Sequence, residues 1–202
     1  MVAIFGPQDA DNLVSAVAHG DLVVLPTDTV YGIGANPFSS VAVQRILCAK
    51  GRSETMPPPI LIGSYGDYSK VATSMSPGMT RLTEAFWPGA LTVILPARTT
   101  LGWDISTTGG TVAVRQPGLE LTRQVLDKTG PLAVTSANLH SMAPAQNVAD
   151  AAAYFGQKVA AYLDGGPTPG PVPSTIVSQR EDAPVILREG VISADSIFEV
   201  WQ

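Results

Sequence analysis

The spacing of apolar side chains divides the chain into helical and extended segments. Apolar positions recur every three or four residues in six stretches, which predicts helices over residues 9–19, 39–50, 77–86, 119–127, 147–155 and 193–201. Short apolar or alternating runs predict strands over residues 21–25, 60–62, 91–95, 111–115, 132–134, 174–177 and 185–188. In the run 111–115, a period of two places Thr111, Ala113 and Arg115 on one face.

Residues with special backbone preferences mark the ends of these elements. Ser39 is expected to cap the N-terminus of the second helix, and Gly51 to stop it in the left-handed conformation. Asn147 is the expected cap of the helix 147–155. Pro26 should end the first strand, because proline cannot donate to a central ladder.

Strands outnumber those that a strict βαβ alternation would need. The pattern therefore predicts an α/β fold, with a twisted mixed β-sheet flanked by helices and one domain over residues 1–202. Polar residues follow several of the strands, so we expect an open ligand-binding cleft at strand ends. The prolines before the strand at 60–62 indicate either a loop leading into it or an edge strand.

Composition narrows the classes of protein that fit this fold. The 202 residues are 45% hydrophobic, enough for a sizeable core, while 12 Lys+Arg against 17 Asp+Glu give a net charge of −5. A protein that binds nucleic acid over its whole surface would be basic, so any contact with a polyanion should be confined to a local patch. The single cysteine, Cys48, has no disulfide partner and is expected to be a buried filler.

Neither a signal peptide nor a membrane span is expected. No basic-then-apolar start and no run of 18 apolar residues is present, which predicts a cytoplasmic protein without membrane contact. His19 and His140 are isolated and neither pairs with a cysteine, so no protein metal site is predicted.

Familiar nucleophile and phosphate-binding motifs are also missing. There is no nucleophile elbow and no Walker lysine, and Gly32-Ile33-Gly34 is too short to indicate a dinucleotide site. What remains is a set of cations and neutral donors that suits phosphates and carboxylates and would act by positioning and charge stabilisation. It comprises Lys50, Arg52, Arg115, Arg188, Thr27, Thr111, Ser136, Asn138 and Ser174.

The run Leu-Pro-Thr-Asp-Thr-Val-Tyr-Gly-Ile-Gly at residues 25–34, with Lys50-Gly51-Arg52 following, resembles the signature of the YrdC-type threonylcarbamoyl-adenylate synthases. The resemblance covers about residues 8–195, and later blocks follow the family's order at residues 112–117, 136–138, 173–177 and 187–190. It implies condensation of L-threonine, bicarbonate and ATP to threonylcarbamoyl-AMP and pyrophosphate, magnesium entering with ATP. A partner machinery would then transfer the threonylcarbamoyl group to adenosine in tRNA.

The same resemblance implies a role for each matched residue. Thr27, Arg115 and Ser174 would bind threonine, while Lys50, Arg52, Thr111, Ser136, Asn138 and Arg188 would bind ATP. No catalytic side chain is implied; Lys50 and Arg52 would lead the charge stabilisation. The alternative for Arg115 is an ion pair at a strand edge, and Arg188 has a structural alternative as well.

The chain departs from the family pattern in two places. Ser53 follows the Lys-Gly-Arg triplet where the family has proline, and Met56-Pro57-Pro58-Pro59 replaces an Asn/Lys-Pro-Leu sequence. After Asn138, His140-Ser141 stands where Ser-Gly is usual. Two other functions stay open: a maturation-factor domain that forms carbamoyl-adenylate, and a non-catalytic RNA-binding module.

Overall fold

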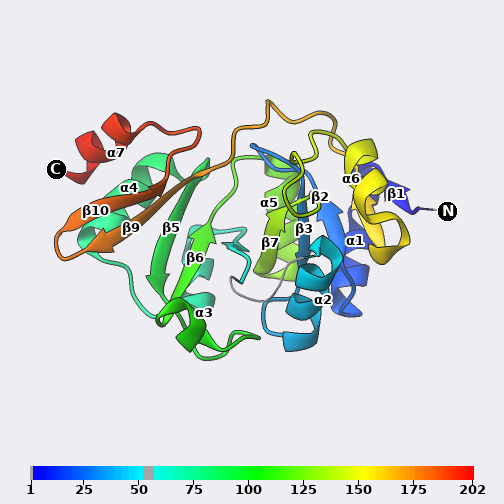
Figure 1. Cartoon of the computed structure of the whole chain (residues 1–202), viewed down its shortest axis with the longest axis horizontal. Coiled ribbons are helices and arrows are strands. Elements are labelled where there is room, and N and C mark those ends of the chain that lie inside the picture. Colours follow the sequence, from blue (N-terminus) through cyan, green and yellow to red (C-terminus); the bar gives the residue numbers. More distant parts are fainter. Residues whose placement is uncertain (1, 52–56) are drawn as a thin grey trace.

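One continuous β-sheet runs through the molecule (Figure 1). The computed structural model describes residues 2–51 and 57–202. Its ten strands lie in the order β1-β8-β2-β3-β7-β4-β6-β5-β9-β10. They are β1 Ile4–Phe5, β2 Val23–Leu25, β3 Gly32–Ala35, β4 Ile60–Leu61, β5 Leu91–Pro96, β6 Thr111–Arg115, β7 Leu132–Ser136, β8 Ala161–Leu163, β9 Thr175–Arg180 and β10 Ala183–Arg188.

Helices lie on both sides of this sheet. The α-helices are α1 Asp11–Ala18, α2 Ser40–Lys50, α3 Tyr68–Val71, α4 Pro77–Phe86, α5 Glu120–Thr129, α6 Val148–Phe155 and α7 Ala194–Trp201. Short 3-10 turns occur at η1 Pro7–Asp9, η2 Tyr65–Asp67, η3 Ile105–Thr108 and η4 Gly156–Lys158. Because β2 runs antiparallel to β3 and parallel to β8, the sheet is mixed, and the predicted fold class is confirmed.

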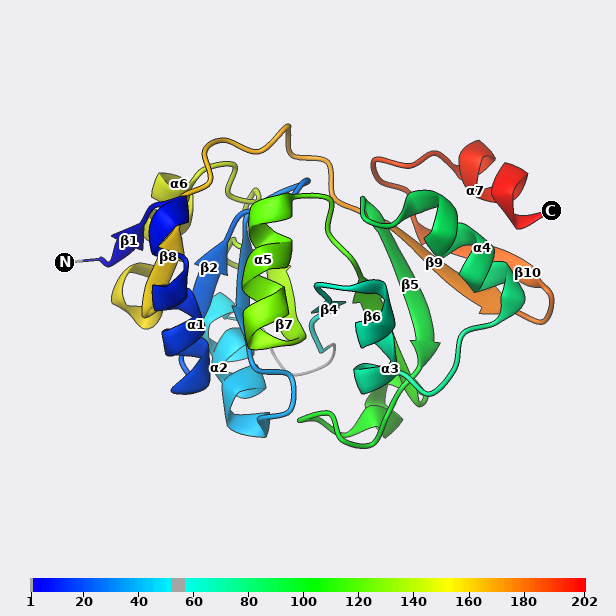
Figure 2. The ribbon, with the colours of Figure 1, turned by 180° about the vertical axis from the view of Figure 1, so that it is seen from behind.

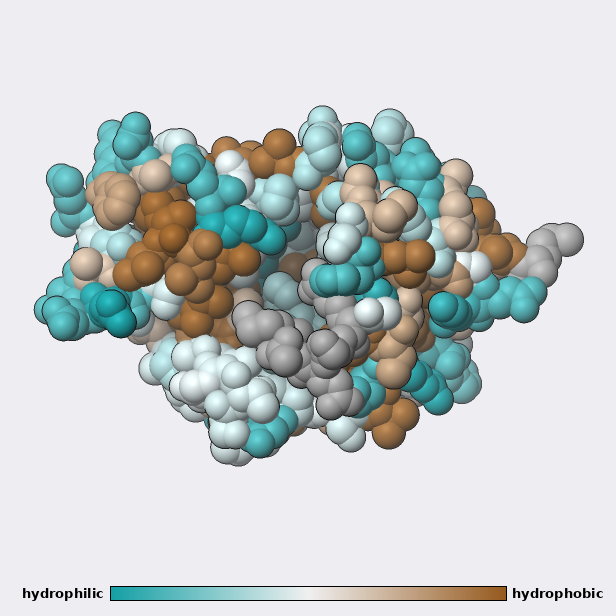
Figure 3. Space-filling view, in the orientation of Figure 1, coloured by the Kyte–Doolittle hydropathy of each residue, from teal (hydrophilic) through white to brown (hydrophobic). Residues whose placement is uncertain are grey.

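The two halves of the sheet are covered differently. Around β2, β3, β7 and β8, α1 and α5 pack on one face and α2 and α6 on the other (Figures 1 and 2). Around β5, β9 and β10, α4 and α7 cover a single face. The opposite face of this half is open, and apolar side chains gather on it beside a hollow in the surface (Figure 3). None of the helices in the described ranges is long and apolar enough to cross a membrane.

The edge of the open half is formed by β10. Its pairing with β9 is interrupted by a register shift between Ile186 and Arg188. Val185 and Leu187 remain 36% and 59% exposed on this strand. The open half therefore exposes two apolar side chains on its edge strand.

The predicted caps are confirmed. Ser39 accepts a hydrogen bond from the Ala42 amide and Gly51 ends α2 at φ +67°. Asn147 accepts from the Asp150 amide at the start of α6. The predicted helices and strands all occur, with ends shifted by a few residues.

One alternative is decided and two expectations need correction. Ile60–Leu61 lies between β7 and β6, so β4 is not an edge strand and the prolines before it belong to a loop that leads into it. Cys48 is exposed and not a buried filler, because it lies on the outer side of α2. Residues 32–34 were read only as a motif fragment, yet Gly32–Ala35 forms β3, paired on both sides with β2 and β7.

Glycine is needed in β3 because the side chains of β7 press against it. A Cβ on Gly34 would lie 2.9 Å from Val134 Cγ2 and 3.3 Å from the Ala133 carbonyl oxygen. Hydrophobic periodicity could not detect this strand, because its glycines add no apolar side chains to the pattern. They let the backbone of β3 lie close to β7.

We expect Gly34→Ala to lower the free energy of unfolding by about 1–3 kcal/mol, the usual result of overpacking a closely packed interior. Urea denaturation of the purified protein measures it. Gly66→Ala is the matched control, since no atom lies within 4 Å of its Cβ position. Equal losses in the two variants would contradict the close packing of β3 on β7.

Candidate functional site

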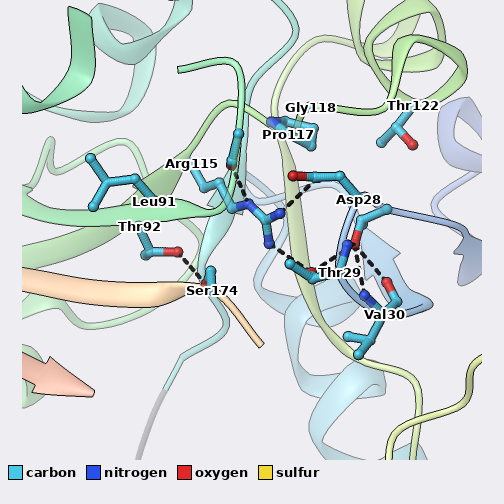
Figure 4. A network of polar contacts seen from close by, with 12 residues as sticks. Asp28, Thr29, Val30, Leu91, Thr92, Arg115, Pro117, Gly118, Thr122 and Ser174 are labelled. Atoms are coloured by element: carbon cyan, nitrogen blue, oxygen red, sulfur yellow. Dashed lines mark hydrogen bonds and ion pairs between the residues drawn. The ribbon is translucent and has the colours of Figure 1, made fainter. Parts of the chain in front are cut away.

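Arg115, the last residue of β6, is the centre of a buried polar network (Figure 4). Its side chain reaches the loop after β2, where Nη2 lies 2.7 Å from Asp28 Oδ1 and Nη1 lies 3.0 Å from Thr29 Oγ1. Nε donates to the Gly89 carbonyl oxygen at 2.9 Å. Arg115 is only 5% exposed, so this network fixes the position of the loop against the strand.

The loop after β2 holds its shape through Thr27. The Thr27 hydroxyl donates to the Val30 carbonyl oxygen at 2.6 Å and accepts from the amides of Thr29 and Val30. This hydroxyl is therefore occupied within its own loop, while that of Thr29 faces Arg115. Predicted as a threonine ligand, Thr27 occupies a position from which it shapes the loop.

Ser174 forms the second part of the network, just before β9. Its hydroxyl lies 2.8 Å from that of Thr92 on β5, as Figure 4 shows. From β10, the Arg188 guanidinium donates to the Ser174 carbonyl oxygen at 2.8 and 3.1 Å and to its hydroxyl at 3.2 Å. β6, β10 and the segment before β9 thus bring Arg115, Arg188 and Ser174 into one region.

The charges of this network do not cancel. Burial lowers the pKa of Arg115, and the charge of Asp28 opposes that effect. Burial and the nearby charge of Arg115 lower the pKa of Arg188. Both guanidinium groups stay protonated. Within the described chain, Arg188 makes no ion pair with a carboxylate, so one positive charge is left over and favours an anion.

A second cluster forms around Lys50, the last residue of α2. Its ammonium donates to the carbonyl oxygens of Ser136 and Asn138 at 2.5 and 2.9 Å, and to Asn138 Oδ1 at 3.3 Å. The Ser136 hydroxyl donates to the same Oδ1 at 2.6 Å. Lys50 is 1% exposed, so it brings its charge directly beneath the loop that follows β7. Three of the predicted ATP ligands therefore lie together.

The other predicted ATP ligands lie elsewhere. Arg52 falls outside the described residues, as do Ser53 and Met56. Arg188 lies with Arg115 and not with Lys50. Thr111 lies at the opposite end of β6 from Arg115, roughly 13 Å away along a strand. Its hydroxyl donates to the Thr108 carbonyl oxygen, and it lines a pocket of about 380 Å³ where β5 and β9 diverge.

A smaller pocket of about 290 Å³ opens beside Asp28. Its walls are the loop after β2, the segment leading into α5 and residues 165–169. In the part of the chain that the structure describes, no three His, Cys, Asp or Glu side chains gather as metal ligands would.

Three members of the network were missed from the sequence. Asp28 and Thr29 belong to the motif already singled out. The Thr27 hydroxyl bonds within the loop and that of Thr29 faces Arg115, but nothing in the sequence distinguishes the two hydroxyls. Thr92 did carry a signal, because it is the one hydroxyl inside the apolar run 91–95.

Comparison with known proteins gives a family match. The Sua5/YciO/YrdC family model, described as "Telomere recombination", matches residues 15–190. A protein of Mycobacterium tuberculosis is 42% identical over 187 residues, which cover 93% of this chain and 86% of that protein.

Two further relatives are longer than this chain. The threonylcarbamoyl-AMP synthase of Bacillus subtilis is 39% identical over 188 residues, 90% of this chain and 53% of that protein. The crystal structure of Pyrococcus abyssi Sua5 complexed with L-threonine superimposes with a TM-score of 0.90 at 32% identity, covering 99% of this chain and 60% of Sua5. The chain thus spans between about half and two thirds of these two proteins.

We expect Asp28→Ala to cost about 2–4 kcal/mol of unfolding free energy, because it leaves the Arg115 charge buried without its carboxylate. The Asp28 side chain keeps 21% exposure, which places the cost below that of a fully buried pair. Asp11→Ala is the control, since its ion pair with Lys128 is exposed and should be worth at most about 1 kcal/mol. Denaturant titration compares the two, and equal losses would show that Arg115 does not depend on Asp28.

Proposed function

The chain belongs to the Sua5/YciO/YrdC family, and from this membership we propose that it is a threonylcarbamoyl-AMP synthase. L-threonine, bicarbonate and ATP would give threonylcarbamoyl-AMP, pyrophosphate and water. The product would pass to a machinery that transfers the threonylcarbamoyl group to adenosine in tRNA. This reaction fits a cytoplasmic enzyme, with any direct tRNA contact weak.

The observation that carries the proposal is that Arg188, which donates to Ser174, lies near enough to Arg115 for the two charges to interact, while Asp28 pairs with Arg115 and leaves one positive charge in excess. A free amino acid brings a carboxylate that this charge can pair with. Arg115 uses three of its five N–H groups in the contacts above, which leaves two for a substrate. The Pyrococcus abyssi Sua5 that shares the fold was crystallised with L-threonine, which supports this assignment.

ATP would bind toward the Lys50 cluster. Lys50 holds the loop of Ser136 and Asn138 and supplies a cation close to it. Charge-assisted hydrogen bonds from such a cation suit phosphate oxygens. The resemblance also assigns Arg52, Thr111 and Arg188 to ATP, but Thr111 lies at the far end of β6 and Arg188 lies beside Arg115.

Catalysis would then follow from positioning and charge. The threonine amine and bicarbonate must form a carbamate, whose oxygen attacks the α-phosphorus of ATP while pyrophosphate leaves. Fixed cations lower the barrier by stabilising charge that develops on the phosphate oxygens, and the described site needs no covalent intermediate on the protein. The role of the polar side chains is to hold the reacting groups in line.

Pyrophosphate release should require threonine and bicarbonate together with ATP. Serine should replace threonine poorly, because a missing methyl group in a fitted pocket costs about 1–3 kcal/mol. A coupled pyrophosphate assay with single omissions tests this. Dependence on carbamoyl phosphate would identify a carbamoyl-adenylate-forming domain instead, and no turnover with any of these substrates would leave the RNA-binding alternative.

Magnesium should be required with ATP, as the phosphates themselves can serve as its main ligands. Titrating a chelator into the pyrophosphate assay should abolish turnover, and restoring excess magnesium should recover it. The melting temperature should stay unchanged under the same titration, because the metal would arrive with the nucleotide. Full turnover in excess chelator would contradict the proposal.

A further inference from the structure

The connector between β8 and β9, residues 164–173, links the two halves of the sheet across one end of the molecule (Figure 1). Ten residues include four prolines and three glycines. The prolines occur at every second position from residue 167 to residue 173, which makes this part stiff and extended. Gly165 and Gly166 precede it, and Gly166 adopts φ +80°, a left-handed conformation that favours glycine.

Because the proline-rich part is stiff, its direction depends on the residues that hold Gly165 and Gly166. Its far end leads directly to Ser174, the residue contacted by Arg188 and Thr92. Its near end forms a wall of the 290 Å³ pocket beside Asp28. A change of angle at the glycine pair would therefore alter the pocket and the approach to Ser174 together.

Tyr31 holds the glycine pair. Its hydroxyl donates to the Gly166 carbonyl oxygen at 2.7 Å and accepts from the Gly165 amide at 3.2 Å. Asp164 supports the same turn by accepting from the Gly166 amide at 2.9 Å. Burial raises the pKa of Tyr31 to about 12, so the hydroxyl keeps its proton and remains a donor at neutral pH.

The backbone of Tyr31 connects this contact to the rest of the site. Its amide donates to the Ala145 carbonyl oxygen at 3.1 Å, and its carbonyl oxygen accepts from the Ala137 amide at 2.8 Å. Ala137 lies between Ser136 and Asn138, the partners of Lys50. Two residues before Tyr31, Thr29 contacts Arg115. Tyr31 thus contacts the connector through its side chain, and its backbone connects this contact to both polar clusters.

We infer that Tyr31 is a positioning residue, whose hydroxyl sets the angle of the connector so that the pocket and Ser174 are in place for substrate. The inference rests on the proposed function and adds to it a residue that itself contacts no reacting atom. Its effect should appear mainly in threonine binding, because the connector leads to Ser174 and borders Asp28.

Tyr162 supplies a matched control. Like Tyr31 it is fully buried, and its hydroxyl donates to a glycine carbonyl oxygen, that of Gly156, at 2.7 Å. Gly156 follows α6 and lies outside the connector and both clusters. Tyr31→Phe and Tyr162→Phe therefore each remove one buried hydroxyl that donates to a glycine carbonyl oxygen. They differ in what that hydroxyl holds, and the Tyr31 hydroxyl also accepts from the Gly165 amide.

The test combines kinetics with hydrogen exchange. Tyr31→Phe should raise the KM for threonine about threefold to tenfold, as expected for the loss of a buried hydrogen bond, with a smaller change in kcat. Exchange at the amides of Gly165, Gly166 and Thr168 should become faster. Tyr162→Phe should leave the threonine KM and these amides within twofold of the wild type, even though both variants melt at a lower temperature.

Equal threonine KM values and equal connector exchange in the two folded variants would overturn the inference. If Tyr31→Phe does not fold, Asp164→Ala loosens the same turn from the other side, and unchanged connector exchange in that variant would likewise count against it. Wild-type protein without threonine-dependent pyrophosphate release would instead refute the proposed function. The exchange comparison would still decide whether Tyr31 holds the connector.

Discussion

The buried ion pair between Arg115 and Asp28 is the interaction on which the site depends. A guanidinium group that is 5% exposed must be compensated, and here the compensation comes from a loop that belongs to the other half of the sheet. The pair therefore fixes the position of the loop after β2 against β6, in addition to neutralising the buried charge. Thr29 and the Gly89 carbonyl oxygen accept further hydrogen bonds from the same guanidinium. Arg115 therefore holds three segments together: the loop after β2, the end of β6 and the segment before β5.

The different coverage of the two half-sheets explains why polar groups collect where they do. One half is packed between helices on both faces and is rigid enough to hold the loops after β2 and β7. The other keeps one face open, so residues at its strand ends stay within reach of a ligand. Only two residues of β4 join the halves in the sheet, between β7 and β6. The polar network lies at this join, where neither helix layer closes over it.

Local signals in the sequence were enough for most elements and for the grouping of several polar residues. Caps such as Ser39 and the alternation in β6 act over a few residues, so spacing predicts them. β3 escaped detection because its glycines are required by side chains of a distant strand. The direction of a hydroxyl is also a tertiary property, so the sequence could not show that the Thr27 hydroxyl bonds within its loop while that of Thr29 faces Arg115. The interior place of β4, despite its prolines, depends on partners that lie far away in the sequence.

The register shift in β10 has a consequence for how the protein behaves at high concentration. An edge strand carrying exposed Val185 and Leu187 would ordinarily invite a second chain to extend the sheet. Pro184 offers no amide hydrogen to such a chain, and the irregular spacing before Arg188 breaks the regular repeat that an added strand would have to match. The apolar edge at β10 is thereby poorly suited to polymerise through its backbone.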